Sequence, residues 1–213
     1  ANMENFGSRV LPTYHFEKAD LIVGLSADFL GSWISPTAFS VAYGKRRKVN
    51  QLNRHIQVES IPTLSGSNAD LRIPVKASEE DLAVLRLHNL IAQQAGQATI
   101  SDKSSFEAEK LGTVANELWA AKGKSLVVSG SNNEGVQTLI MGINEMLGAY
   151  GTTLDLDNAS YQKQGNDTQM TQFVGELKAG NVGAVVFYNA NPVYNHPQGS
   201  EIAAGLSKVK VSI

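Results

Sequence analysis

Three polar turns, each following an apolar run, carry the residues best suited to chemistry in this chain. The runs 19–25, 125–130 and 183–188 lead into turns at 26–28, 129–132 and 189–192. Backbone amides freed in the turn after a strand are where α/β folds hold nucleotides and phosphates. A nucleotide pocket is therefore the chemistry that these turns suggest. The candidate contacts are Asp28, Ser129, Gly130, Asn189 and Asn191.

Each turn also has a simpler structural interpretation. The turn at 129–132 reads Ser-Gly-Ser-Asn, which lacks both the Gly-x-Gly-x-x-Gly pattern and the Lys-Ser/Thr pair of a phosphate loop. Gly and Asn are ordinary turn formers. In the Asn-Ala-Asn-Pro turn at 189–192, Pro192 forces its predecessor to be extended, which fixes the turn. Its Asn side chains can pair with a purine edge or with the backbone of the turn itself, and both interpretations stay open.

Other kinds of site are poorly supported by the residue types. The chain has no cysteine, which excludes disulfides, Cys-ligated zinc, iron–sulfur clusters and thiol catalysis within these residues. Its four histidines are scattered without the spacing of metal ligands, and no serine lies in a nucleophile elbow. We therefore predict no catalytic residue and no metal ligand in this chain.

Composition narrows the class of partner. The 213 residues are 42% hydrophobic, so the chain can bury a core. Its net charge of −2 does not favour binding to nucleic acid. The basic run Lys45 to Lys48 is expected near a helix C-terminus, where cations suit the helix dipole. No stretch approaches the ~20 apolar residues of a membrane span. Residues 1–5 lack the features of a signal peptide, and the strand-like end at 209–213 suggests an excised fragment.

The elements expected around the turns alternate between strands and helices. Continuous apolar runs with β-branched residues are typical of parallel strands buried on both faces. The pattern predicts an α/β fold with a parallel, Rossmann-like sheet and helices on both faces. We expect strands at 19–25, 56–59, 71–75, 126–128, 184–188 and 209–213 and helices at 36–43, 78–91, 106–121, 135–147, 168–179 and 200–207. The segment 152–167 shows no clear strand signal beyond 153–156.

A domain boundary is expected between Gly96 and Ser105, where the sequence is small, polar and without periodicity. This predicts two lobes, residues 1–100 and residues 101–213. The first lobe would contain the turn at 26–28, and the second would contain the turns at 129–132 and 189–192.

Several segments together resemble the molybdopterin oxidoreductase superfamily. Residues 18–30, with Trp33, Ser35-Pro36 and Tyr43-Gly44, resemble its second domain, and residues 67–75 are similar to a segment that precedes a helix there. Residues 128–131 and 190–194 resemble the third domain, which contacts a guanosine end of the cofactor in that family. The sequence departs from the family pattern at Ser26, Phe29, Lys76 and Ala77.

Within that superfamily the chain looks most like the large iron–sulfur subunit of alternative complex III, a membrane quinol oxidoreductase. The matching segments are 27–30, 63–70 and 191–194, and the resemblance extends from about Phe6 to Ile213. It implies folds like domains II and III of the family and a molybdopterin-like region without its cofactor. It also implies iron–sulfur clusters elsewhere in the full-length protein, and other subunits of a membrane-bound respiratory complex as partners. The implied location is the periplasmic side of the cytoplasmic membrane, as a peripheral protein without a membrane span of its own.

Three functional hypotheses follow. The first is a cofactor-free scaffold and interaction region of that subunit. The second is a fragment of an active oxidoreductase that holds molybdopterin guanine dinucleotide, with its metal ligand outside this chain. The third is a free-standing nucleotide- or thiamine-diphosphate-type binding domain. If the chain descends from a cofactor binder, we expect the turns at 129–130 and 189–192 to lie side by side, with the crevice between them narrowed or filled.

Overall fold

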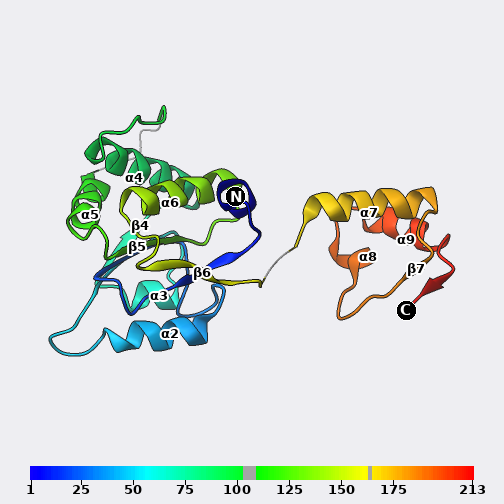
Figure 1. The fold of residues 1–213 in the computed structure, drawn as a ribbon, viewed down its shortest axis with the longest axis horizontal. Helices are drawn as coiled ribbons and strands as arrows, with labels where there is room; N and C mark the ends of the chain where they lie inside the picture. Colours follow the sequence, from blue (N-terminus) through cyan, green and yellow to red (C-terminus); the bar gives the residue numbers. More distant parts are fainter. Residues whose placement is uncertain (103–108, 163–164) are drawn as a thin grey trace. The chain divides into compact units, whose positions relative to one another are not determined.

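The computed structural model describes residues 1–102, 109–162 and 165–213, and it divides the chain into two compact units, Ala1–Gln162 and Lys163–Ile213. Figure 1 shows the helices and strands of each. The elements of the first unit are α1 (Asn2–Phe6), β1 (Leu11–Tyr14), β2 (Leu21–Leu25), α2 (Pro36–Lys45), β3 (Arg54–Glu59), α3 (Leu64–Ser67), β4 (Leu71–Pro74), the 3₁₀ turn η1 (Ala77–Glu79), α4 (Glu80–Gln94), α5 (Glu109–Ala120), β5 (Ser125–Ser129), α6 (Glu134–Met146) and β6 (Leu154–Ser160). Those of the second are α7 (Asp167–Ala179), β7 (Ala184–Val185), α8 (Pro192–Asn195), α9 (Gly199–Leu206) and β8 (Val211–Ser212).

A four-stranded parallel sheet organises the first unit. Its strand order is β4-β3-β2-β5, and Val23 at the centre of β2 is level with Ile56 on one side and Val127 on the other. Helices α4, α5 and α6 cover one face, while α2 and α3 lie on the other (Figure 1). The predicted α/β class with a parallel sheet is confirmed.

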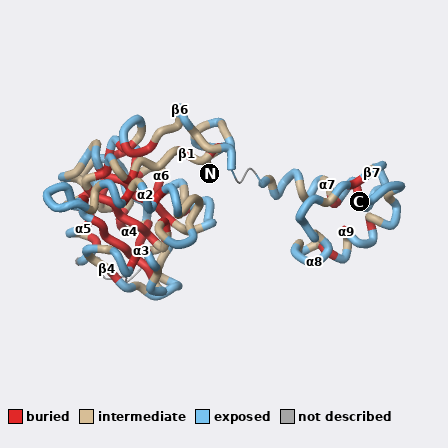
Figure 2. Tube along the Cα trace, turned by 90° about the horizontal axis from the view of Figure 1, so that it is seen from below, coloured by how far each residue is buried: buried red, intermediate tan, exposed pale blue. Residues whose placement is uncertain are grey.

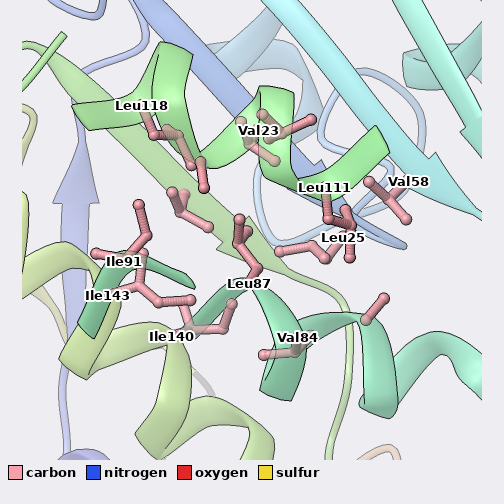
Figure 3. Packing of buried hydrophobic residues seen from close by; sticks show 14 of the residues in the cluster. Val23, Leu25, Val58, Val84, Leu87, Ile91, Leu111, Leu118, Ile140 and Ile143 are labelled. Carbon is pink, nitrogen blue, oxygen red and sulfur yellow. The ribbon is translucent and has the colours of Figure 1, made fainter. Parts of the chain in front are cut away.

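The core explains why the strands form where the sequence is continuously apolar. Every residue of β2 and of β5 is buried, because helices cover both faces of the sheet. Figure 2 shows the buried residues gathered in the interior of the first unit. Val23 and Leu25 pack with Leu87, Leu111 and other residues of the helices α4, α5 and α6 (Figure 3). The opposite face has a separate, aromatic-rich cluster: Phe16, Ala19, Ile22, Ala27, Phe29, Phe39, Tyr43, Leu126, Val128, Ala149 and Leu154.

The outer edge of β5 is closed by side chains instead of a further strand. Asn144 of α6 accepts a hydrogen bond from the Val127 amide at 3.1 Å and donates one to the Val127 carbonyl at 2.8 Å. Two other carbonyls of β5 also accept hydrogen bonds from side chains. Thr153 Oγ1 donates to the Ser125 carbonyl, and Gln137 Nε2 donates to the Ser129 carbonyl. Because these backbone groups already have partners, the edge presents no free ladder for another strand.

A two-stranded antiparallel ribbon, β1 with β6, was not expected from the sequence. Thr13 is level with Asp155, and the register shifts between Leu11 and Thr13. β6 has the polar sequence Leu-Asp-Leu-Asp-Asn-Ala-Ser, in which Asp155 bonds the amides of Asp157 and Asn158. This local bonding resembles a turn, so the strand pairing depends on a distant partner and gives little local signal.

The second unit has its own small core. Strands β7 and β8 pair in parallel, with Ala184 level with Val211 and Val185 level with Ser212. Helices α7 and α9 supply most of the remaining core, which contains Val174, Leu177, Val185 and Ile202.

The predicted boundary near residue 100 is not where the structure divides. Strand β5 pairs with β2, so residues from both sides of that boundary build one sheet. The division falls instead at 162/163, inside the segment that showed little strand signal. The helix predicted from Phe106 is present as α5 from Glu109, and its predicted first residues lie outside the described part of the chain. No helix in the described ranges is long and apolar enough to cross a membrane.

Candidate functional site

The candidate site lies at the carboxyl edge of the four-stranded sheet, between β2 and β5. From β2 the chain continues to β3 and β4 on one side, and β5 then adds on the other side. Such a reversal of strand order is where open α/β sheets bind ligands. The cavity here measures only about 10 Å³, and its polar lining comes from Ser26, Ser129, Ser131, Glu80 and Asp81. That volume holds no more than about one water molecule.

Close backbone contact between two turns narrows this crevice. Ser26 has a left-handed backbone with φ 53°, and its amide donates to the Val58 carbonyl at 2.8 Å. The Gly130 amide donates to the Leu25 carbonyl at 3.0 Å. A Cβ on Gly130 would lie 2.1 Å from the carbonyl oxygen of Ser26, so only glycine fits. The amides of Ser26 and Gly130 are therefore used within the sheet.

Four backbone amides around the start of α6 also have acceptors within the chain. The Ser131 amide donates to Ser129 Oγ at 3.1 Å, and the Asn133 amide donates to Ser131 Oγ at 3.2 Å. Asn133 is the N-cap of α6, and its Oδ1 accepts from the amides of Gly135 and Val136. In nucleotide-binding folds the amides at this place face phosphate. Here the turn's own side chains accept from them.

A carboxylate of the chain itself lies against the same turn. Ser131 Oγ donates to Asp81 at 3.4 Å, and Asn133 Nδ2 donates to its other oxygen at 3.3 Å. The neighbouring Glu80 accepts from the Ser60 amide at 3.0 Å. Two acidic side chains at the start of α4 therefore line the crevice, and they oppose the approach of a phosphate anion.

Asp28 lies at the same edge, but its carboxylate accepts hydrogen bonds from another part of the fold. Its Oδ1 accepts from both the amide and the hydroxyl of Ser65, each at 3.0 Å. Its carbonyl accepts from the amides of Gly31, Ser32 and Trp33. The two bonds to Ser65 join the turn after β2 to α3.

Asn189 and Asn191 belong to the second unit. Asn189 has a left-handed backbone with φ 51°, and Asn191 caps α8 by accepting from the Tyr194 amide at 3.3 Å. The sequence left open whether these Asn side chains pair with a purine edge or with the backbone of the turn. Asn191 bonds the backbone of the turn itself.

The expectation that the strand before this turn is a neighbour of β5 in one parallel sheet is wrong. Among the described strands β7 pairs with β8, whereas β5 pairs with β2 in a different sheet. The physical reason is the closed outer edge of β5, whose backbone groups already bond to side chains. The structure thus brings Ser129 and Gly130 to the carboxyl edge with Asp28, whereas Asn189 and Asn191 follow a strand of the other sheet.

Sequence reasoning missed a row of buried polar side chains on β3. His55, Gln57 and Glu59 point to the same face of the sheet and are all buried. His55 Nε2 lies 3.3 Å from Gln57 Oε1, and Gln57 Nε2 donates to the Ala27 carbonyl at 3.2 Å and to Glu59 at 3.4 Å. The alternation of polar and apolar residues from 55 to 59 was the available signal. It is typical of a strand with one face in water, yet both faces are covered here.

Glu59, at the carboxyl end of this row, anchors the loop that leads into α3. It accepts from Thr63 Oγ1 at 2.6 Å and from Arg72 Nε at 2.7 Å. Burial raises the pKa of Glu59, but the hydrogen bonds from Thr63, Arg72 and Gln57 outweigh it, so the pKa lies below its usual value. The carboxylate therefore remains charged and bound.

The other end of the row is closed by Tyr43 and Asp70. The Tyr43 hydroxyl lies 3.1 Å from His55 Nδ1, and burial raises the pKa of Tyr43 to about 12. Asp70 accepts from the His55 amide, and its hydrogen bonds from Arg47 hold its pKa below the usual range. The expected place of the basic run is confirmed: α2 ends at Lys45, Arg46 caps it, and Arg47 pairs with Asp70.

This burial predicts a pH-dependent stability. Burial lowers the pKa of His55 from 6.5 to about 4, so the unfolded chain binds this proton more readily than the folded chain. The stability that the neutral, buried His55 contributes to the fold is complete above pH 6.5 and falls as the pH drops toward 4. Between pH 7 and pH 5 the free energy of unfolding should fall by about 2 kcal/mol from this group. Urea unfolding at both pH values measures it, with His55→Gln expected to show a smaller fall. An NMR-titrated His55 pKa above about 6 would contradict the prediction.

Comparisons with known proteins leave the family open. No protein-family model matches the chain, and no curated protein matches it. In the described part of the chain, no three His, Cys, Asp or Glu side chains gather as potential metal ligands. The interpretation of the site therefore depends on the geometry above.

Proposed function

We propose that this chain is a non-catalytic scaffold and interaction region of an oxidoreductase complex. In this proposal it is the molybdopterin-like region of an iron–sulfur subunit in a respiratory quinol oxidoreductase. The clusters are carried elsewhere in the full-length protein, and the partners are other subunits at the periplasmic side of the membrane. The sequence resemblance supports the family and the complex.

The observation that carries the proposal is the closure of the crevice at the carboxyl edge. A guanine dinucleotide needs free amides for its phosphates and room for its sugar and base. The cavity here measures about 10 Å³, and side chains accept from the amides of Ser131, Asn133, Gly135 and Val136. The residues present at this edge do not fit the nucleotide.

The titratable groups near this edge support the same proposal. Asp28 joins the turn after β2 to α3, and Glu59 joins β3 to the loop before α3. Both carboxylates are bound by hydrogen-bond donors that hold the backbone in place. Carboxylates bound in this way stabilise the fold, which a scaffold requires.

Guanine nucleotide binding tests the proposal on this chain. We expect GDP and GTP to leave the unfolding temperature unchanged up to millimolar concentrations. A ligand at ~100 times its Kd would add about 2.7 kcal/mol to the free energy of unfolding, a shift that thermal denaturation detects easily. Asp81→Asn is a useful second variant, because it removes the charge beside the α6 turn and leaves the bonds to the amides in place. A saturable shift in the unmodified chain would favour the alternative of an active molybdopterin enzyme.

Thiamine diphosphate belongs in the same screen. It separates the third hypothesis, a free-standing binding domain, from the proposed scaffold. Stabilisation by this ligand but by no guanine nucleotide would favour the third hypothesis.

A further inference from the structure

The segment between α2 and β3 forms a loop that carries two exposed apolar side chains. The Gln51 amide donates to the Lys48 carbonyl at 3.0 Å, which closes a turn with Val49 and Asn50 at its centre. Asn50 has φ 67°, a left-handed backbone that asparagine tolerates at the third position of a turn. Val49 is 84% exposed and Leu52 is 63% exposed. Figure 1 shows this loop extending beyond the end of α2.

We call residues 45–52 the basic loop, because they begin with Lys-Arg-Arg-Lys and include no acidic residue. Its two arginines fasten the loop to the rest of the first unit. Arg46 pairs with Asp20 at 2.6 Å, and Arg47 pairs with Asp70 at 2.8 Å. Each arginine also donates to a carbonyl of the segment that returns to β3. These bonds give the basic loop a fixed base.

The two lysines of the basic loop are not used in this way. Lys45 and Lys48 are exposed, and neither forms an ion pair with any residue that the structure describes. The acidic side chains near the base of the loop have other partners: Asp20 has Arg46 and Lys124, Asp70 has Arg47, Glu117 has Arg54, and Glu17 has His15. Lys45 and Lys48 therefore add positive charge that these carboxylates do not pair with.

Unpaired cations beside exposed aliphatic side chains indicate what kind of surface the loop fits. An anionic membrane offers lipid headgroups to lysine and, directly beneath them, an apolar layer to valine and leucine. A nucleic acid offers phosphates, but it has no such layer for Val49 and Leu52. Between Asp28 and Glu59 the chain has no Asp or Glu, so α2 and the basic loop bring no carboxylate toward an anionic surface.

We propose that the basic loop docks the first unit onto an anionic lipid membrane. Lys45 and Lys48 contact the headgroups, and Val49 and Leu52 enter the boundary between headgroups and acyl chains. Two lysines and two aliphatic side chains give a weak and reversible contact, which supplements other attachments of the protein. This contact with lipid is separate from the subunit contacts of the proposed scaffold, so its failure would leave that function standing.

Vesicle sedimentation of the full-length protein tests the role of the lysines. Binding to phosphatidylcholine vesicles with about 30% phosphatidylglycerol should exceed binding to pure phosphatidylcholine at least about tenfold and should fall as salt is added. Lys45→Gln with Lys48→Gln is expected to weaken binding about tenfold or more. The control Lys110→Gln with Lys210→Gln removes the same charge at two other exposed lysines and should change binding less than about threefold. Equal losses in the two double variants, or equal binding to both vesicles, would overturn the proposal.

Photo-crosslinking in the cells that produce the protein tests what the apolar side chains touch. Val49→p-benzoylphenylalanine is expected to form an adduct with a phospholipid, detected by mass spectrometry of the modified peptide. The matched control is Ile61→p-benzoylphenylalanine, because Ile61 is 72% exposed in the same unit and lies outside the basic loop. An adduct with an acidic protein in place of lipid, no adduct at Val49, or equal lipid adducts at both positions would overturn the proposal.

Discussion

Replacing Asn144 with leucine is expected to lower the free energy of unfolding of the first unit by about 3–5 kcal/mol. The Asn144 side chain bonds the amide and carbonyl of Val127 and also donates to the Ile140 carbonyl at 3.0 Å. The Val127 groups are buried at the outer edge of the sheet and the Ile140 carbonyl belongs to α6, and leucine can bond none of them. A buried donor or acceptor left without a partner costs about 1–3 kcal/mol, and Val127 would contribute two. Urea denaturation followed by circular dichroism measures the loss.

Asn116→Leu is the matched control for this substitution. Asn116 lies on the exposed side of α5, where its side chain accepts from Gln94 at 2.9 Å in contact with water. Its replacement should change the free energy of unfolding by no more than about 0.5 kcal/mol. Equal effects at the two positions would show that the edge of β5 does not depend on Asn144.

Gly130→Ala is expected to lower the free energy of unfolding by about 3 kcal/mol, near the upper end of the usual range for overpacking. The new methyl group would lie 2.1 Å from the Ser26 carbonyl oxygen. A flexible side chain could move away, but this obstacle is backbone, and the Ser26 amide is itself bonded to β3. The turns after β2 and β5 would therefore have to separate. Thermal and urea denaturation both report this change.

Gly112→Ala serves as the opposite control. Gly112 lies within α5, and a Cβ there meets no atom within 4 Å. Alanine favours the helix over glycine, so this variant should gain about 0.5–1 kcal/mol. If Gly130→Ala were as stable as the unmodified chain, the close contact that narrows the crevice would be refuted.

The elements with strong local signals could be predicted from the sequence. The apolar runs at 19–25 and 125–130 became β2 and β5 because helices cover both of their faces. Helix α6, predicted at 135–147, runs from Glu134 to Met146, with Asn133 as its cap. The helix after Ser78 is preceded by the short 3₁₀ turn η1 and continues as α4. In each case a local sequence pattern indicated the element.

Features that depend on distant residues could not be predicted in this way. The polar side chains of His55, Gln57 and Glu59 alternate as in a half-exposed strand, and their burial follows from α2 and α3 packing over them. The predicted domain boundary failed because β5 pairs with β2, a contact over about a hundred residues.

The candidate site was predicted in part. Ser129 and Gly130 do lie at the carboxyl edge beside the turn after β2, and the crevice between the two turns is narrow. The turn at 189–192 was expected beside them because its strand is apolar. The edge of β5 is nevertheless closed by side chains from α6 and from the loop before β6, which no local pattern indicates.

The most direct test of the proposed function is metal analysis of the full-length protein, purified with its natural partners. We expect inductively coupled plasma mass spectrometry to find no stoichiometric molybdenum or tungsten. Iron in the same sample is the internal control, because the proposed subunit carries its clusters outside this chain. Iron without molybdenum or tungsten is the predicted result. Molybdenum or tungsten at about one atom per chain would contradict the proposal and show that the protein still holds a metal-bearing cofactor.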